Sequence, residues 1–493
     1  MATEGRASRE FDLLVIGAGS GNSLIGPELD DWSVALIDDG VWFGGTCLNA
    51  GCIPTKMFVR VADVATDAVD ARRLGLEARI EKADWPAMRS RVFNRTDSIS
   101  ESGYRYRNED NPNVTVFRSS VRFEDKHTVV TAEGERLHGR KVVVAAGSRP
   151  RQLDAGVEDD PAIHDSDTIM RIEELPSSLI IIGGGAVAVE FAHVFSSFGV
   201  EVTMVNRSGR LLRAQDAEIS ETFTKLAAER WNVVGGASVA SIRRDGAELA
   251  VTLTDDRVLA AAMVLVAQGR LPNTDRLGVA AAGFDLRADG TIAVDRAQRV
   301  LAGGVPVPGV FALGDVSNSY QLKHLANHEA RLVAHNLLDP PNLAEGYPGP
   351  VPAAIFSHPQ IAHFGLTEEQ ARRSGLEYVV VVQSYGSTAY GWALEDTTSF
   401  CKLVVGRDSG ELLGAHILGP EASILIQPLI QAASERRSIR GLARSQFWPH
   451  PAATEVVENA LLAAEEKLDR SGATSEPGTG AESETGRSSE GHE

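Results

Sequence analysis

The sequence has 493 residues, of which 43% are hydrophobic and 23% are charged, a composition typical of a globular protein with several domains. Its formal net charge of −19 argues against nucleic acid or an anionic membrane as the main partner. Only three cysteines are present, which excludes a secreted disulfide scaffold. No run of about 18 apolar residues could span a membrane, and the polar residues 1–10 lack the apolar core of a signal peptide. We therefore expect a cytoplasmic protein.

The first predicted element is a short buried strand that ends in a glycine-rich turn. Residues 11–16 are followed by Gly17-Ala18-Gly19-Ser20-Gly21-Asn22, which is expected to open a helix. The first two glycines permit a tight turn and close approach of a pyrophosphate to the helix N-terminus, whereas Asn22 in place of a third glycine predicts looser helix packing. Asp38 follows the next strand, residues 34–37, and could accept hydrogen bonds from a ribose. The strand and the acidic residue favour a dinucleotide site over a plain turn.

Two cysteines lie five residues apart in the segment 44–56. In a regular helix the Cα atoms of Cys47 and Cys52 would be about 8–9 Å apart, whereas a disulfide needs about 4.4–6.8 Å. Pairing therefore requires a distorted backbone, which Asn49 and Gly51 permit. A strained local bridge suits a bond that is opened and reclosed. The alternative is a pair of buried, unreactive thiols.

The next predicted elements connect this unit to a second one. We expect a helix over residues 85–107 and a small antiparallel layer formed by 114–123 and 128–131. Residues 142–150 read as a strand that enters a Gly/Pro turn, which is typical of a crossover between domains.

A second glycine-rich fingerprint follows the apolar run 179–182. It reads Gly183-Gly184-Gly185-Ala186-Val187-Ala188, and the next strand, 201–205, ends in Asn206-Arg207 where an NAD site would have an acidic residue. Arg207 and Arg213 could bind a 2′-phosphate, which favours NADPH. The alternative is that both arginines are solvated surface charges.

The rest of the chain predicts a return to the first unit and then a third domain. Residues 264–270 repeat the strand-and-glycine pattern of 142–150, and 310–315 lead back to the first unit. Residues 351–468 have the mixed pattern of a separate α+β domain. We expect strands at 400–405 and 412–418, a long amphipathic helix at 422–435, and disorder in the Gly/Ser/Glu-rich residues 471–493.

A histidine and a carboxylate near the C-terminus form a candidate acid/base pair. His450 precedes Glu455 by five residues, so the carboxylate could orient the imidazole. Histidines near glutamates are common on protein surfaces, and the pair alone is a weak signal. The remaining histidines, including His324, His328 and His358, have no metal-ligand spacing with cysteine, so we expect no metal site.

Together these motifs resemble those of the flavoprotein disulfide reductases. The two fingerprints, the Cys47–Cys52 segment, Ala312-Leu313-Gly314-Asp315 and the His450–Glu455 pair occur in the order of that family, over about residues 11–465. Further stretches are similar to the members that reduce mycothione, namely residues 17–22, 52–59, 324–331, 390–397 and 451–461.

The resemblance implies an α/β fold with two Rossmann-like dinucleotide-binding domains and a C-terminal α+β dimerisation domain. The implied boundaries are 1–150 and 272–345 for a discontinuous FAD domain, 151–271 for an NADPH domain, 346–470 for the dimerisation domain, and 471–493 for the disordered tail. The FAD residues would be Gly17, Gly19, Ser20, Gly21, Asp38, Gly45, Thr46, Lys56, Ala146, Gly147, Gly314 and Asp315, the last on the ribityl chain. The NADPH residues would be Gly183, Gly185, Ala188, Glu190, Arg207, Arg213 and Gly269.

The resemblance also assigns catalytic roles. Cys47 would attack the substrate disulfide, and Cys52 would be the charge-transfer thiol against the flavin. Lys56 and Glu190 would pair near the flavin. His450, held by Glu455, would act across a homodimer on Cys47 of the other subunit. Electrons would pass from NADPH to FAD, then to the two cysteines and to a small disulfide.

One departure from the family pattern bears on the substrate. Glutathione reductases carry an arginine on the helix after the first fingerprint, which contacts the substrate carboxylate. Here that helix is short, is interrupted by Gly26-Pro27, and has no arginine before Asp38. The departure favours a less acidic disulfide such as mycothione over glutathione disulfide.

Two other functions remain open from the sequence. A dihydrolipoamide dehydrogenase shares the cysteine segment and the His–Glu pair but uses NAD, which Asn206-Arg207 disfavours. A non-catalytic alternative is a flavoprotein subunit tethered in a larger complex through the acidic tail.

Overall fold

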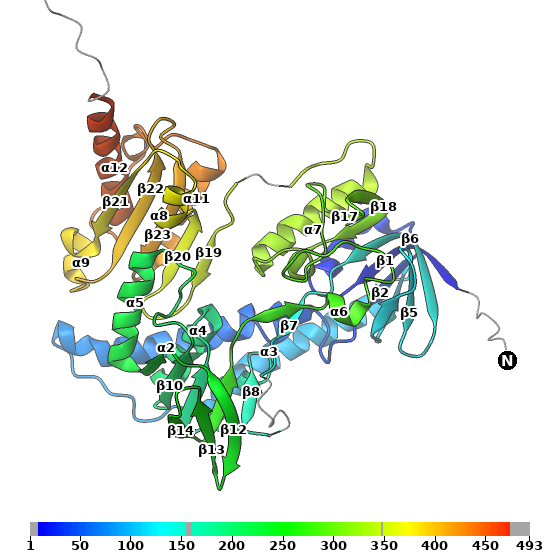
Figure 1. Cartoon of the computed structure of the whole chain (residues 1–493), viewed down its shortest axis with the longest axis horizontal. Coiled ribbons are helices and arrows are strands. Elements are labelled where there is room, and N and C mark those ends of the chain that lie inside the picture. The colour runs from blue at the N-terminus through cyan, green and yellow to red at the C-terminus, as the bar shows by residue number, and fades with distance from the viewer. Residues whose placement is uncertain (1–7, 154–159, 347–348, 474–493) are drawn as a thin grey trace, which may run out of the picture.

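The computed structural model describes residues 8–153, 160–346 and 349–473. Figure 1 shows three regions, each built on its own sheet, with the long helices α2 (Cys52–Asp70) and α3 (Trp85–Arg105) extending between them. The first two sheets have parallel cores and the third is antiparallel. This arrangement confirms the predicted α/β fold class with an additional C-terminal α+β region. Within the described residues, no helix is both long and apolar enough to cross a membrane.

The first sheet has a parallel centre that is buried on both faces. β1 (Arg9–Ile16) pairs with β2 (Val34–Ile37) on one side and β6 (Arg136–Val144) on the other. Apolar layers cover both faces, which explains why these strands read as continuous apolar runs. The sheet continues with β3 (Val114–Phe117) beyond β2, with β18 (Val305–Ala312) and β17 (Arg299–Ala302) beyond β6, and with the antiparallel β4 (Val121–Phe123) and β5 (Thr128–Thr131).

Two expectations for this region are wrong. Residues 114–123 do not form one antiparallel layer, because β3 lies parallel to β2, whereas β4 pairs antiparallel with β5. The first fingerprint leads into two 3-10 turns, η1 (Gly21–Leu24) and η2 (Pro27–Leu29), and not into an α-helix. Gly26 is extended, with φ −119° and ψ −179°, because the residue before proline disfavours the helical region.

The second sheet is entirely parallel and carries the second fingerprint. Its central strand β9 (Ser178–Ile182) leads into α4 (Ala186–Ser197), so this fingerprint does open an α-helix as predicted. β10 (Glu201–Asn206), β11 (Asn232–Gly235), β15 (Met263–Val266) and β8 (Ile163–Asp165) complete the sheet, α5 (Ala217–Arg230) packs beside it, and β12 (Val239–Asp245), β13 (Glu248–Leu253) and β14 (Val258–Ala261) form a separate layer.

A two-stranded ribbon joins the first two regions. β7 (Ser148–Pro150) pairs antiparallel with β16 (Arg270–Pro272), where the chain leaves the first region and where it returns. The returning chain forms α6 (Thr274–Leu277), strands β17 and β18, the turn η6 (Gly314–Val316) and α7 (Lys323–Leu338).

The third sheet has the order β19-β20-β23-β22-β21 and is antiparallel throughout. The expected helix 422–435 is divided into α10 (Ala422–Leu425) and α11 (Gln427–Ser434), since Pro428 in the first turn of α11 cannot continue a helix. The last helix, α12 (Glu455–Ala473), extends past the expected start of disorder at residue 471, and residues 474–493 lie outside the described residues. The other strands and α-helices of this region are β19 (Ala353–Ile355), β20 (Ile361–Gly365), α8 (Glu368–Arg373), β21 (Tyr378–Ser384), α9 (Ala389–Ala393), β22 (Phe400–Gly406) and β23 (Leu412–Leu418).

A buried lysine fastens the third sheet to the second region. The Lys402 ammonium on β22 lies 2.9 Å from Asp216 at the start of α5 and 2.7 Å from Glu368, the first residue of α8. Glu218 is 3.3 Å away. Burial alone would lower the pKa of Lys402, but its bonds to Glu368 and Asp216 outweigh burial and raise the pKa above its ordinary value. The ammonium is therefore charged and held by three carboxylates.

Candidate active site

The two cysteines lie on consecutive helices separated by a sharp break. Cys47 is in α1 (Gly45–Asn49), and Cys52 is the first residue of α2. The break occurs at Ala50–Gly51, where a side chain on Gly51 would approach the Thr46 carbonyl oxygen to 2.9 Å. Only glycine fits at position 51, because the backbone of α1 packs closely against it. This agrees with the expected distortion of the backbone between the two cysteines.

Asn49 has a different role from the one expected. It remains helical in α1, and its buried side-chain amide donates to the carbonyl oxygens of Phe43 (2.9 Å) and Gly45 (3.0 Å). Asn49 therefore holds the loop before the cysteines in place. It does not supply the backbone distortion between them.

Cys47 and Cys52 are brought together as two free thiols joined by a hydrogen bond. The hydrogen bond from Cys47, together with the nearby Lys56 ammonium, lowers the pKa of Cys52 to about 6, against the opposing effect of burial. The same hydrogen bond, with burial, raises the pKa of Cys47. In the dithiol form the negative charge therefore resides on Cys52 and the proton on Cys47.

The pKa of Cys52 gives a testable pH dependence. We expect the reduced protein to titrate one thiol with an apparent pKa near 6, so that a Cys52 thiolate is present at pH 7 and is lost as the pH falls through about 6. Thiolate absorbance in the ultraviolet, followed in a Cys401→Ala background, measures this ionisation. A thiol pKa near 9 for both cysteines would contradict the charge distribution.

A lysine–glutamate ion pair connects α2, which begins at Cys52, to α4, which follows the second fingerprint. The Lys56 ammonium lies 2.5 Å from the Glu190 carboxylate on α4 and 4.8 Å from the centre of the Phe356 ring. Glu190 also accepts a hydrogen bond from the Phe356 amide at 2.8 Å. The predicted pairing of Lys56 with Glu190 is thus present in the geometry, one helical turn after Cys52.

At the first fingerprint, close backbone packing leaves no room for a side chain at Gly17 or at Gly45 of the cysteine segment. A Cβ on Gly17 would lie 2.3 Å from the Ala145 oxygen, and one on Gly45 would lie 2.6 Å from Gly19 Cα. Backbone from the fingerprint and from the cysteine segment therefore meet directly. The packing of the fingerprint against β1 is tighter than expected, because a Cβ on Gly21 would lie 2.9 Å from side-chain atoms of both Val15 and Ala145. Of the other predicted residues, Ser20 accepts a hydrogen bond from Lys323 at 2.8 Å, and Thr46 is exposed.

A buried carboxylate oxygen beside this fingerprint lies 3.9 Å from the Arg118 guanidinium, and it fits a nucleotide hydroxyl. Asp38 Oδ1 accepts a hydrogen bond from the Gly40 amide at 2.9 Å, whereas Oδ2 is buried and has no hydrogen-bond partner among the described residues. Burial raises the pKa of this carboxyl group. A buried oxygen of this kind is costly unless a ligand donates to it, and ribose hydroxyls are suitable donors.

Asp315 lies at the other end of the predicted FAD residues, where the ribbon meets the first sheet. Its carboxylate accepts a hydrogen bond of 2.6 Å from Ser148. Gly314 precedes it with φ +73°, and the Ala146–Gly147 backbone accepts bonds from Asn273. The predicted FAD residues Ala146, Gly147, Gly314 and Asp315 therefore lie close to the ribbon.

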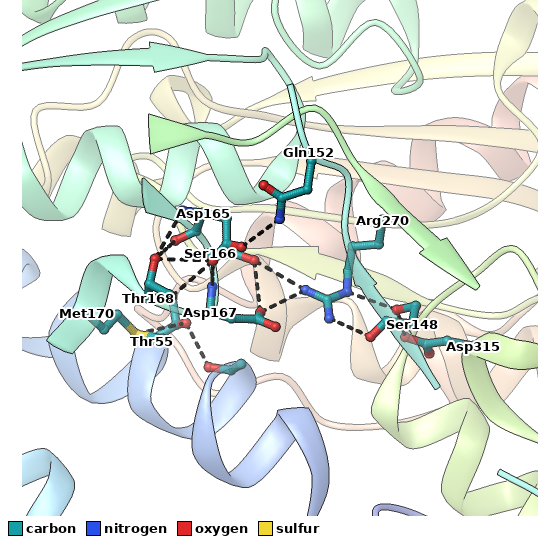
Figure 2. Close-up of polar contacts among 11 residues, drawn as sticks. Thr55, Ser148, Gln152, Asp165, Ser166, Asp167, Thr168, Met170, Arg270 and Asp315 are labelled. Atoms are coloured by element: carbon teal, nitrogen blue, oxygen red, sulfur yellow. Dashed lines mark hydrogen bonds and ion pairs between the residues drawn. The ribbon is translucent and has the colours of Figure 1, made fainter. Parts of the chain in front are cut away.

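Three polar residues near Asp315 were not found from the sequence. Glu329 on α7 is buried and accepts from the Gly314 amide at 2.7 Å, and burial raises its pKa to about 7. The other two are Ser148 and Arg270, which lie on the two strands of the ribbon and are hydrogen-bonded to each other (Figure 2). In the sequence, Glu329 lies within the apolar face of a helix and Arg270 directly follows Gly269. Neither feature identifies the residue that the side chain contacts.

A pocket of about 120 Å³ lies at the second fingerprint. It is lined by Gly185, which directly precedes α4, by the first turn of α4, and by Gly269 and Arg270 where β16 begins. Gly183 cannot carry a side chain, because its Cβ would lie 2.2 Å from the Ala267 oxygen. Ala188 is buried under the helix. The exposed amide groups at a helix N-terminus favour an anionic ligand such as pyrophosphate.

The two predicted phosphate-binding arginines are exposed near this fingerprint but do not line the pocket. Within the described part of the chain, neither Arg207 nor Arg213 has a hydrogen bond or ion pair. Arg210, between them, is bound to Glu221 at 2.6 Å. The Asn206 side chain donates to the Arg210 carbonyl oxygen at 2.7 Å, so it shapes the loop that presents both arginines.

The predicted acid/base pair is close but is not hydrogen-bonded. His450 Nδ1 lies 3.7 Å from Glu455 Oε2, which exceeds hydrogen-bond distance. Glu455 instead accepts from the Ala389 amide of α9 at 3.2 Å. The His450 side chain is 67% exposed, and no contact within the described chain joins it to Cys47. A single chain therefore brings together the thiols but not the thiols and the imidazole.

Comparison with known proteins shows the family. Residues 11–330 match the family described as pyridine nucleotide-disulphide oxidoreductase, and residues 351–461 match the dimerisation domain of the same family. The chain belongs to the pyridine nucleotide-disulphide oxidoreductase family. As a member it is a FAD-containing disulfide oxidoreductase that uses NADPH and forms a homodimer, as the resemblance implied.

Individual relatives cover nearly the whole chain. The mycothione reductase of Mycobacterium tuberculosis (strain ATCC 25618 / H37Rv) is 47% identical over 461 residues, which is 92% of this chain and 99% of the relative. The dihydrolipoyl dehydrogenase of Chlamydia pneumoniae is 30% identical over 94% of this chain and 98% of the relative. Among solved structures, the HOCl-induced flavoprotein disulfide reductase RclA of Escherichia coli has a TM-score of 0.79 and 25% identity, and the match covers 92% of this chain and 99% of that chain.

Proposed function

We propose that this oxidoreductase reduces mycothione to mycothiol with NADPH as the electron donor. The Cys47–Cys52 pair is the observation that supports disulfide exchange most directly, because its one shared proton leaves a thiolate on Cys52 at neutral pH. The 47% identity to a mycothione reductase, compared with 30% to a dihydrolipoyl dehydrogenase, supports the choice of substrate. With few cysteines and free thiols, the protein suits the reducing conditions of the cytoplasm.

The residues present define the proposed steps. Bound FAD would supply the two electrons that convert a Cys47–Cys52 disulfide into the dithiol. Cys47, deprotonated by His450 of the partner subunit, would attack one sulfur of the substrate disulfide. A mixed disulfide with Cys47 forms, and the departing thiolate takes the proton from that imidazole. The Cys52 thiolate would then attack Cys47, so that the second product leaves as a thiolate and the Cys47–Cys52 disulfide forms again.

The segment after the first fingerprint supports a substrate other than glutathione disulfide. Its two 3-10 turns carry Glu28 and no arginine, and Asp30 and Asp31 follow them as exposed carboxylates. Such a surface would repel the carboxylates of glutathione disulfide, whereas mycothione is less acidic.

A panel of disulfides tests the substrate. We expect kcat/KM with NADPH to be greater for mycothione than for glutathione disulfide or lipoamide by about two orders of magnitude, which corresponds to about 2.7 kcal/mol of transition-state binding. Efficient reduction of glutathione disulfide would reject mycothione as the substrate and leave the family unchanged. Preference for lipoamide with NADH would instead favour a dihydrolipoamide dehydrogenase.

The exposed arginines predict the choice of nucleotide. Arg207→Glu combined with Arg213→Ala should shift the NADPH/NADH ratio of kcat/KM towards NADH by about one to two orders of magnitude, because the charge-assisted interaction with a 2′-phosphate contributes about 1.5–3 kcal/mol. Arg210→Ala is the matched control, since Arg210 is already paired with Glu221. An unchanged ratio in the double variant would reject the two arginines as the phosphate site.

A further inference from the structure

Arg270 occupies a position shared by the two nucleotide regions. It is the first residue of β16, it lines the pocket at the second fingerprint, and its side chain is only 16% exposed. Figure 2 shows its guanidinium between Ser148 on one side and the turn containing Ser166 and Asp167 on the other. The bonds to that turn are 3.2 Å to Ser166 Oγ and 3.1 Å to Asp167 Oδ1.

The bonds of Arg270 to Ser148 fix the direction of one hydroxyl group. Arg270 Nε donates to Ser148 Oγ at 2.9 Å, and Nη2 donates to the Ser148 carbonyl oxygen at 2.8 Å. A serine hydroxyl has a single hydrogen. Because the Ser148 oxygen already accepts from the cation, its hydrogen is directed to Asp315 Oδ2, 2.6 Å away. A hydroxyl polarised by a cation is also a stronger donor to a carboxylate.

The turn on the other side of Arg270 is held independently of it. Asp165 Oδ1 accepts hydrogen bonds from the Asp167 amide (2.9 Å) and the Thr168 amide (3.1 Å), which is a turn closed by its own aspartate. Met170, in the same segment, accepts a hydrogen bond from Thr55 of α2 at 3.6 Å. Ser166 and Asp167 therefore form a fixed support from which the guanidinium extends to Ser148 (Figure 2).

One N–H group of Arg270 remains available for a ligand. The guanidinium has five N–H donors in a rigid plane, and its four hydrogen bonds to Ser148, Ser166 and Asp167 leave one on Nη2 without a partner among the described residues. An anion in the pocket could accept that hydrogen without displacing any of the other four bonds. It would then hold the guanidinium more firmly against Ser148.

We propose that Arg270 is a positioning residue that couples occupancy of the pocket at the second fingerprint to the retention of FAD, through Ser148 and Asp315. The inference rests on the proposed function, in which Asp315 holds FAD and the pocket accepts the pyrophosphate of NADPH. A nucleotide in the pocket restrains Arg270, Arg270 restrains Ser148, and Ser148 orients the carboxylate that holds the flavin cofactor. Coupling of this kind is reciprocal, so FAD must strengthen nucleotide binding by the same factor.

The test measures release of FAD from the holoenzyme by the rise in flavin fluorescence. The ligand is 2′-phospho-ADP-ribose, which has the pyrophosphate of NADPH but no nicotinamide ring to stack on the flavin. In the unmodified protein we expect a saturating concentration of this ligand to slow FAD release by about fivefold or more. In Ser148→Ala, release should be faster and independent of the ligand, although the ligand still binds. Arg270→Lys, which keeps the charge but loses the planar fork, should also lose the ligand effect.

Arg149→Gln is the matched control. Arg149 is on the same ribbon, but its guanidinium binds Asn273 and Asp275 and not Ser148, so this variant should keep the full ligand effect. The proposal is overturned if the ligand does not slow FAD release in the unmodified protein, or if it slows release equally in Ser148→Ala. Should Arg270→Lys fail to fold, Ser148→Ala still decides the result. No disulfide takes part in this measurement, so its outcome is separate from that of the substrate panel.

Discussion

Cys47→Ser should abolish disulfide reduction, with a loss of about 10⁴-fold or more, as expected when a nucleophile is removed. A serine at this position can still donate a hydrogen bond to the Cys52 sulfur but cannot form a disulfide. The Cys52 thiolate should therefore persist and give a long-wavelength charge-transfer band with oxidised flavin, without prior reduction. Cys52→Ser should also lose turnover but should never show that band. Absorbance spectra and stopped-flow turnover of both variants measure these outcomes.

Two further variants separate the causes. Cys47→Ala removes the hydrogen bond that lowers the pKa of Cys52, so the charge-transfer band should titrate at a higher pH in Cys47→Ala than in Cys47→Ser. Cys401→Ala is the control, because Cys401 is fully buried on β22 and burial raises its pKa to about 12. Identical spectra for Cys47→Ser and Cys52→Ser would show that the two roles are assigned wrongly.

His450→Ala should slow the oxidative half-reaction by about 10²–10⁴-fold, the usual contribution of a general acid/base. Reduction of the flavin by NADPH should be nearly unchanged, because the imidazole acts only where the disulfide is exchanged. Rapid mixing of the reduced enzyme with mycothione, and of the oxidised enzyme with NADPH, measures the two half-reactions separately. His335→Ala is a suitable control, since His335 is an exposed histidine on α7 that binds the Asn342 carbonyl oxygen.

Mixed dimers test whether the site is shared between subunits. The exposed imidazole makes no contact with Cys47 within the described chain, so we expect it to meet Cys47 of the partner subunit. A heterodimer of His450→Ala and Cys47→Ser chains would then contain one site with both residues intact and should recover activity. Heterodimers that are shown to form but remain inactive would reject the shared site.

The sequence predicts the elements that depend on local pattern. Apolar runs that end in glycine identified β1 and β9, and the breaking of a helix at Gly51 followed from the distance that a disulfide requires. The same local reasoning placed an interruption at Gly26-Pro27 after the first fingerprint, but it missed that the short segments on either side are 3-10 turns and not α-helix.

The part of the site that depends on distant partners could not be predicted. Ser148 and Arg270 are 122 positions apart, and only the pairing of β7 with β16 brings them together. Glu455 was expected to hold His450, but its oxygen is bound to the Ala389 amide, which belongs to a helix 66 positions away. Such contacts arise from tertiary packing, which single residues and short motifs do not specify.

The buried Lys402 restricts which domains of related proteins could replace the corresponding domain of this chain. Its three carboxylate partners belong to two regions, with Asp216 and Glu218 in the second and Glu368 in the third. A chimera that imports a foreign nucleotide domain without an acid at position 216 would remove one carboxylate from the buried ammonium and leave Glu368 as its partner in the third region, which should lower the stability of the fold. An imported nucleotide domain would therefore have to keep an acid at this position, and a cofactor preference is more safely altered by exchanging single arginines than by exchanging whole domains.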